Sequence, residues 1–152
     1  MAKYVTLKRI YQRLWLMISN LPMSGHGVRP WFVKMGGVKI LDPKHTFIST
    51  DIGWDTVHPE KIIIESGVRI TARTSILTHF INPLNGDYTS GEVHIKKGAF
   101  IGTGTIITKP VTIGERSVIG AGSVVTKDIP KDEVWAGNPA KLIRKRKYEQ
   151  IK

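Results

Sequence analysis

A period of six residues runs through the second half of the chain and restricts the folds that the chain can adopt. Between positions 93 and 130, a large aliphatic residue returns at each sixth position: Ile95, Ile101, Ile107, Ile113, Ile119 and Val125. The fifth position of each unit is small or β-branched: Ala99, Thr105, Val111, Ser117, Ser123 and Ile129. Neither an α-helix nor an alternating strand repeats in this way, whereas a hexapeptide β-helix does. We therefore predict a narrow prism of short parallel strands, with the large aliphatics inside and the small residues at its corners.

The same period extends toward the N-terminus, to about residue 38, with less regular spacing. Its positions there are Ile48, Ile52, Trp54, Ile64, Val68, Ile70, Thr74, Ile76 and Phe80. Residues 57–61 lengthen one of the turns. With three faces to a circuit, we expect Ile76 to lie directly over Trp54 on one face and Ile95 over Ile64 on another. The prism would then have about four to five coils.

One interruption is large enough to form a separate loop. Ile95 follows Ile76 by 19 residues, one more than three units of six. Residues 81–92, INPLNGDYTSGE, are rich in the turn formers Asn, Pro, Gly, Asp and Ser. We expect this excursion to leave the prism between two strands. Loops held by a rigid scaffold often carry function, so the excursion marks a candidate site.

The flanking segments complete a single predicted domain of 152 residues. We expect residues 1–37 to form an N-terminal helix and a lead-in, residues 38–130 the β-helix, and residues 131–152 a C-terminal segment with a short basic helix or tail. Within residues 3–21, an apolar stripe at helical spacing consists of Leu7, Ile10, Leu14, Met17 and Leu21. We expect this stripe to pack against the rest of the fold. The alternative is a helix that lies on a membrane surface.

Charge and cysteine content narrow the classes of partner. The formal net charge is +11, with basic residues concentrated near the two ends of the chain. Because the repeat carries few aromatics for base stacking, we expect an anionic small ligand or an anionic membrane rather than nucleic acid, with solvated basic ends as the plain alternative. The chain has no cysteine, which excludes disulfides, zinc–thiolate sites and an acyl-cysteine intermediate. The sequence shows no export signal or membrane-spanning apolar run, so we expect a cytoplasmic protein.

Three segments resemble a known family: ILTHF (76–80), IGAGSVVTKDIP (119–130) and AGNPAKLIRKR (136–146). They are similar to the left-handed β-helix hexapeptide-repeat acyltransferases, in the branch of galactoside and maltose O-acetyltransferases. The resemblance covers roughly residues 38–146. It implies a left-handed, all-β parallel β-helix, acetyl-coenzyme A as co-substrate, and a homotrimer with active sites between subunits. The N-terminal helix resembles versions found beside polysaccharide-assembly genes.

The base that such a transfer needs is expected to be a histidine, the side chain best suited by its pKa. Of the five histidines, His26, His45, His58 and His94 have the features of exposed or turn residues. His79 stands at the foot of the excursion and occupies the place of the family's catalytic histidine, although Phe80 follows it where many relatives have proline or aspartate. Asp55 follows Trp54 one circuit below and is a candidate to orient His79. It could equally be an acceptor ligand or a turn-forming residue.

The resemblance also implies residues for coenzyme A. Carried over position by position, they are Thr103, Ala121, Gly122, Thr126, Lys127, Lys141 and Arg144. Coenzyme A is a multiply charged anion, so basic side chains at one end of the prism would attract it. Asn82, Asn85 and Asp87 in the excursion are candidates for binding acceptor hydroxyls.

Together these features predict an O-acetyltransferase that moves acetyl from acetyl-coenzyme A to a hydroxyl of a sugar or surface-polysaccharide precursor. His79 would act as the general base, without a covalent acyl-enzyme. An amino sugar or serine-like acceptor, and a non-catalytic β-helix scaffold, are the alternatives. No metal is expected, because β-helix carbonic anhydrases need two histidines five residues apart and no pair here has that spacing.

Overall fold

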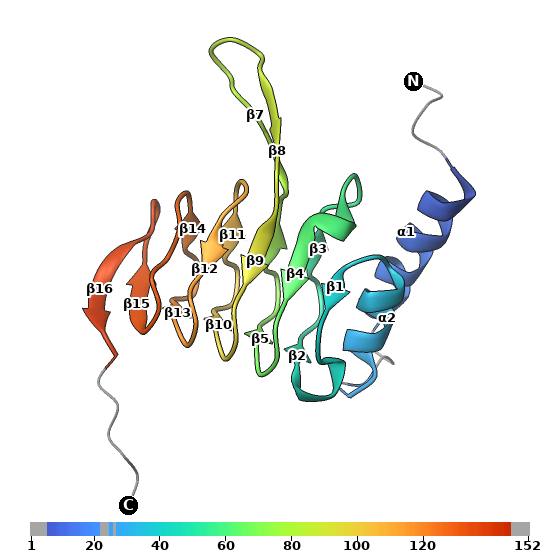
Figure 1. The fold of residues 1–152 in the computed structure, drawn as a ribbon, viewed down its shortest axis with the longest axis horizontal. Helices are drawn as coiled ribbons and strands as arrows, with labels where there is room; N and C mark the ends of the chain where they lie inside the picture. Colours follow the sequence, from blue (N-terminus) through green and yellow to red (C-terminus); the bar gives the residue numbers. More distant parts are fainter. Residues whose placement is uncertain (1–5, 22–24, 26, 147–152) are drawn as a thin grey trace, which may run out of the picture.

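Short strands wind around the long axis of the molecule and stack into three sheets that form the sides of a prism (Figure 1). The computed structural model describes residues 6–21, 25 and 27–146. The first sheet contains β1 (Lys39–Ile40), β4 (Ile62–Ile64), β9 (Val93–Ile95) and β12 (Thr112–Ile113). The second contains β2 (Phe47–Ile48), β5 (Arg69–Ile70), β10 (Phe100–Ile101), β13 (Val118–Ile119), β15 (Glu133–Ala136) and β16 (Lys141–Lys145). The third contains β3 (Gly53–Trp54), β6 (Ser75–Ile76), β11 (Ile106–Ile107) and β14 (Val124–Val125).

The strand register confirms the predicted assignment of faces. Trp54 pairs with Ile76 in the third sheet, and Ile64 pairs with Ile95 in the first. All pairings within these three sheets are parallel except that of β15 with β16. The predicted parallel β-helix is therefore present. We refer below to corner 2/3, where the chain passes from the second sheet to the third, and to corner 3/1, where it passes from the third sheet to the first.

The interior of the prism is filled by the residues that define the period. The six large aliphatics from Ile95 to Val125 are fully buried, and so are Ala99, Thr105, Ser117 and Ser123 at the fifth positions. Burial of each Ile or Val contributes roughly 1.5–3 kcal/mol. Adjacent turns lie so close that a Cβ added at Gly102 would fall 2.5 Å from the backbone nitrogen of Ala121. This close approach requires glycine at that position.

The excursion is a β-hairpin that projects from the prism between β6 and β9 (Figure 1). Its strands, β7 (His79–Ile81) and β8 (Tyr88–Ser90), pair in antiparallel fashion. The excursion therefore begins at His79, two residues earlier than predicted. The expectation that Phe80 continues the buried phase was wrong, because Phe80 already belongs to the hairpin and is 39% exposed. Pairing within the hairpin satisfies the backbone that has left the prism.

Two helices precede the repeat: α1 (Leu7–Ser19) and α2 (Arg29–Met35). The predicted N-terminal helix is confirmed from Leu7 onward, and residues 3–5 of that prediction lie outside the described residues. Helix α2 was not predicted, since its sequence was interpreted as a lead-in. The buried Arg29 ties both helices to the prism by donating hydrogen bonds to the carbonyl oxygens of Ser19 (2.7 Å) and Ile48 (3.0 Å).

The apolar stripe of α1 faces solvent, contrary to the expectation that it packs against the fold. Leu7 is 87% exposed and Met17 is 69% exposed, and Ile10, Leu14 and Leu21 are also exposed. The side chains that α1 buries are Gln12, Leu16 and Ser19. Leu16 is the apolar side chain that α1 adds to the core, the ring of Trp15 stacks on Phe32 of α2, and Asn20 exchanges two hydrogen bonds with the backbone of Ile52. None of the helices in the described part of the chain has the length and apolar character needed to cross a bilayer.

The C-terminal segment is extended where the structure describes it. Strand β16 runs antiparallel to β15 and forms the edge of the second sheet. The prediction of a short basic helix, one of two alternatives, is therefore wrong for residues 141–145. Residues 147–152 lie outside the described part of the chain. Without β16, the backbone N–H and C=O groups on the outer edge of β15 would have no strand to pair with. Pairing with β16 satisfies them.

Candidate active site

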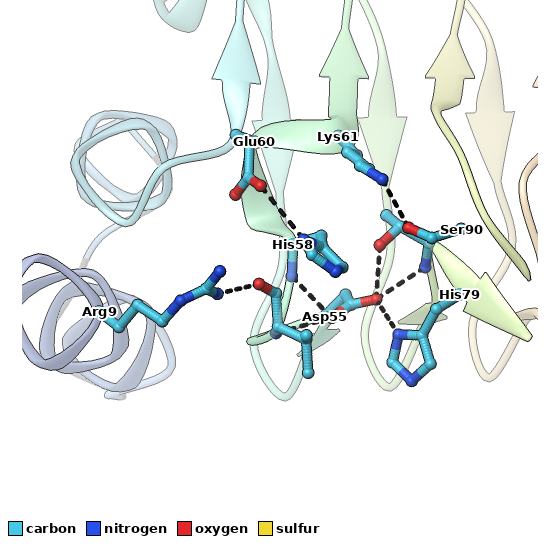
Figure 2. A network of polar contacts seen from close by, with 9 residues as sticks. Arg9, Asp55, His58, Glu60, Lys61, His79 and Ser90 are labelled. Atoms are coloured by element: carbon cyan, nitrogen blue, oxygen red, sulfur yellow. Dashed lines mark hydrogen bonds and ion pairs between the residues drawn. The ribbon is translucent and has the colours of Figure 1, made fainter. Parts of the chain in front are cut away.

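Stacking of the third sheet brings Asp55 and His79 together. Asp55 directly follows β3, and His79 lies three residues after the end of β6. Because β3 and β6 pair side by side, both residues lie at corner 3/1. The carboxylate oxygen Oδ2 of Asp55 lies 2.7 Å from Nδ1 of His79 (Figure 2). The side chain of Asp55 is 1% exposed, while that of His79 is 27% exposed. A buried carboxylate thus contacts the inner edge of an imidazole whose ring still reaches the surface.

Both oxygens of the Asp55 carboxylate accept hydrogen bonds. Oδ2 also accepts from the backbone N–H of Thr78 (2.8 Å) and its hydroxyl (2.6 Å). Oδ1 accepts from the backbone N–H groups of Val57 (2.8 Å) and His58 (3.2 Å). Burial by itself raises the pKa of the Asp55 carboxyl, but the hydrogen bonds from Thr78, Val57 and His58 outweigh it and hold this pKa well below its usual range. Asp55 is therefore an anion at neutral pH.

The charge of Asp55 determines which nitrogen of neutral His79 carries the proton. A carboxylate can only accept a hydrogen bond, so Nδ1 of His79 must donate. The lone pair of the neutral ring then lies on Nε2, at the opposite edge. This is the arrangement in which a histidine can take a proton from a substrate hydroxyl. The sequence predicted both members of this pair, and the structure brings them together.

The hairpin contributes a contact that the sequence did not reveal. The ring of Tyr88 stacks on the ring of His79, with centroids 5.7 Å apart and planes inclined by 21°. Since His79 pairs with Ser90, Tyr88 is its diagonal cross-strand neighbour, and such neighbours lie on the same face of a hairpin. Lys61 fixes the base of the hairpin through a 2.6 Å hydrogen bond from Nζ to the hydroxyl of Ser90 (Figure 2). Tyr88 could only be found once the register of the hairpin was known.

A cavity of about 430 Å³ adjoins this pair and is lined by Arg9, Arg13, Val57, His58 and Tyr88. Arg9 donates a hydrogen bond to the carbonyl oxygen of Val57 (Figure 2). Because Tyr88 both lines the cavity and stacks on His79, the cavity lies next to the imidazole. Its walls come from α1, from the long turn after Asp55 and from the hairpin. It has the size and position for part of a small acceptor.

A second group of predicted residues gathers at corner 2/3, on the other edge of the third sheet. Thr103 lies between β10 and β11, and Ala121 and Gly122 lie between β13 and β14 one turn further along. The N–H of Gly122 donates to the carbonyl oxygen of Thr103, and Lys141 begins the strand that leaves the same corner. All four residues are exposed. A Cβ added at Gly122 would meet no atom within 4 Å, so backbone and open space are both available to an extended ligand such as coenzyme A.

Comparison with known proteins agrees with the repeat and the prism. The family model described as bacterial transferase hexapeptide (six repeats) matches residues 92–127. YvoF of Bacillus subtilis (strain 168), a suggested acetyltransferase, is 34% identical over 117 residues, which are 77% of this chain and 66% of that protein. The repeat of this chain is that of the hexapeptide-repeat transferases. The chain spans slightly less than two thirds of the length of YvoF.

Solved structures of hexapeptide-repeat acetyltransferases share the fold. A maltose O-acetyltransferase from Clostridium difficile 630 is 25% identical, with a TM-score of 0.65 and coverage of 93% of this chain and 87% of that chain. A galactoside acetyltransferase in complex with coenzyme A is 23% identical, with a TM-score of 0.68 and coverage of 97% and 84%. Because the galactoside acetyltransferase is only 23% identical, its similarity to this chain concerns the fold alone.

The remaining coenzyme A candidates do not join the group at corner 2/3. Thr126 and Lys127 follow β14 and lie at corner 3/1, and Arg144 lies further along β16. The ammonium of Lys127 sits 5.0 Å from the centre of the Trp135 ring, which closes the C-terminal end of the prism core. The predicted coenzyme A residues are therefore distributed over two corners of the prism.

The acceptor candidates Asn82, Asn85 and Asp87 form the turn at the tip of the hairpin. Asn85 and Asp87 hydrogen-bond each other through Nδ2 and Oδ2 (2.6 Å), and Oδ1 of Asn82 accepts from the N–H of Leu84. These side chains shape the turn. Their part in acceptor binding stays a prediction.

Other histidines also pair with carboxylates, so pairing alone does not identify the base. His45, His58 and His94 contact Asp42, Glu60 and Glu65 at 2.8, 3.3 and 2.8 Å. The side chains of those three carboxylates are 28–48% exposed, whereas that of Asp55 is buried. His26 lies outside the described residues. Within the described part of the chain, no group of three His, Cys, Asp or Glu side chains could hold a metal ion.

Proposed function

We propose that this chain is an acetyl-coenzyme A-dependent O-acetyltransferase whose acceptor is a hydroxyl of a sugar or surface-polysaccharide precursor. The observation that carries the proposal is the contact between buried, anionic Asp55 and Nδ1 of His79 beside a surface cavity. The hexapeptide repeat of bacterial transferases and the similarity to YvoF support the reaction class. Among solved structures, the similar maltose O-acetyltransferase supports a hydroxyl acceptor.

In this mechanism Nε2 of His79 accepts the proton of the acceptor hydroxyl as its oxygen attacks the carbonyl carbon of the thioester. Asp55 holds the imidazole in the required tautomer and stabilises the imidazolium that forms. His79 then returns the proton to the departing coenzyme A sulfur as the carbon–sulfur bond breaks. Since the chain has no cysteine, direct transfer without an acyl-enzyme is the simplest route.

The separation of the two corners supports assembly as a homotrimer. Corner 2/3 presents Thr103, Ala121, Gly122 and Lys141, while corner 3/1 presents Asp55 and His79. A cyclic arrangement would place corner 2/3 of one subunit against corner 3/1 of the next, so that coenzyme A meets His79 between subunits. We further propose the left-handed winding of the family, with about four to five coils, and a cytoplasmic location.

The proposal is tested by measuring acetyl transfer from acetyl-coenzyme A to a panel of monosaccharides and disaccharides. Release of the coenzyme A thiol reports the rate. His79→Ala is expected to lower kcat/KM about 10²–10⁴-fold, because a general base contributes that much. His94→Ala is the matched control, since His94 also contacts a carboxylate but lies on the first sheet. Thermal stabilisation by acetyl-coenzyme A should be retained in both variants.

Three results would redirect the proposal. Full activity of His79→Ala would remove His79 as the base. Faster transfer to amino sugars or serine than to any hydroxyl acceptor in the panel would favour the amino-acceptor alternative. Absence of any thermal stabilisation of the unaltered protein by acetyl-coenzyme A would favour a non-catalytic scaffold.

A further inference from the structure

The outer face of α1 carries an apolar surface that the described fold leaves uncovered. Leu7, Ile10, Leu14 and Met17 are between 52% and 87% exposed. At about 100° per residue, these four side chains fall within roughly 80° of one another around the helix axis. The buried residues Gln12, Leu16 and Ser19 lie on nearly the opposite side. The stripe is thus continuous and points away from the prism.

Both helices also expose aromatic side chains. Tyr11 on α1 is 49% exposed, and Trp31 on α2 is 50% exposed, with the ammonium of Lys34 6.0 Å from the Trp31 ring. Tyrosine and tryptophan with one apolar part and one polar edge are typical of surfaces that meet the boundary between water and lipid. Figure 1 shows that α1 and α2 lie at the N-terminal end of the prism.

The charged side chains of the two helices are all positive. The first 41 residues contain seven Lys and Arg and no Asp or Glu, and the first carboxylate of the chain is Asp42. Arg29 is buried and Arg9 is bonded to the carbonyl oxygen of Val57, whereas Lys8, Arg13 and Lys34 are exposed. An apolar helix face flanked by exposed cations complements a surface that is apolar inside and negatively charged outside.

We propose that the outer face of α1, with Trp31 of α2, binds the surface of a membrane rich in anionic lipid. Leu7, Ile10, Leu14 and Met17 enter the acyl boundary, and Lys8 and Lys34 contact lipid headgroups. A second copy of the chain is a poorer occupant, because the same face of that copy would bring the same cations and no carboxylate from either helix. This inference is independent of the acetyl-transfer reaction, since none of these side chains contacts Asp55 or His79.

The test is co-sedimentation of the full chain with vesicles of phosphatidylcholine alone and of phosphatidylcholine mixed with phosphatidylglycerol. Binding is expected to the mixed vesicles and to weaken as salt is added. The double variant Leu7→Gln, Leu14→Gln should weaken that binding about tenfold or more. Leu84→Gln is the matched control, because Leu84 is 94% exposed at the hairpin tip. Lys8→Glu should weaken binding more than Lys97→Glu, a charge reversal at an exposed lysine of the prism.

The outcomes distinguish a membrane-binding surface from a subunit interface. The proposal is overturned if the unaltered protein stays in the supernatant with anionic vesicles at low salt, or if the double variant sediments as well as the unaltered protein. It is also overturned if the double variant forms a smaller assembly in light scattering and neither protein binds vesicles, which would assign the stripe to a subunit interface. Far-UV circular dichroism checks that the variants fold. Acetyl transfer to a soluble acceptor should be the same in these variants as in the unaltered protein. If the unaltered protein shows no acetyl transfer at all, the proposed reaction is wrong and the membrane proposal still stands.

Discussion

The prism and helix α1 both carry apolar residues at a regular period, yet the prism buries these residues and the helix exposes them to solvent. In the prism, Ile101 and its equivalents are fully buried. In α1, Leu7 and Leu14 are exposed, while Gln12 and Ser19 are buried. The prism closes on three sides by itself, so its period creates the interior that it fills. The helix needs a separate partner, and it packs through the side that carries Leu16, Gln12 and Ser19 while the side with the longer apolar stripe stays exposed. A period therefore identifies a face without identifying what covers it.

The largest effect is expected inside the prism. Ile101→Ala should lower the free energy of unfolding by about 2–5 kcal/mol, because it removes buried methyl groups and leaves a cavity between stacked turns. Urea denaturation measures the change. A loss of less than about 1 kcal/mol would mean that neighbouring turns collapse into the space, and that the prism is less rigid than its close packing indicates.

The next effect concerns Asp55, a polar residue that the prism buries as thoroughly as its aliphatics. The folded-state pKa of Asp55 is lowered, so its contribution to stability is present above the unfolded pKa of about 3.9 and is lost as the pH falls toward the folded value. Asp55→Asn should cost about 1.5–3 kcal/mol at neutral pH, since an amide group would face the N–H donors of Val57 or Thr78.

Thermal unfolding between about pH 3 and pH 7 checks this prediction. The difference in stability between the unaltered protein and Asp55→Asn should shrink as the pH falls below about 4. A constant difference across that range would show that the carboxylate charge is not what stabilises the corner.

The smallest effects compare two residues of the N-terminal segment. Asn20→Ala should destabilise the protein by about 1–3 kcal/mol, because the backbone N–H and C=O of Ile52 lose their partners. Leu14→Ala should change stability by no more than about 0.5 kcal/mol, since its side chain is half exposed. Urea denaturation of both variants makes the comparison. A larger cost for Leu14→Ala than for Asn20→Ala would contradict the inverted orientation of the helix.

The site was predictable to the extent that it depends on the repeat. Counting in sixes located the interruption after Ile76 and placed Asp55 below His79, because three faces of six residues fix which turns stack. Thr78 and Tyr88 were missed for a different reason. Both act through hydrogen bonding and hairpin register, and neither leaves a period in the sequence. Helix α2 was missed because its seven residues are too short to show a helical pattern.

The sequence by itself determined the prism, its faces and the point at which the chain leaves it, since a six-residue period is compatible with very few backbones. Only the tertiary structure decided that the hairpin begins at His79, that β16 is a strand, and that α1 turns its apolar side outward. Each of these depends on a partner outside the segment itself: β8 for β7, β15 for β16, and the backbone of Ile52 for Asn20. Local patterns record which side chains a segment can bury, whereas the partner determines which of them are buried.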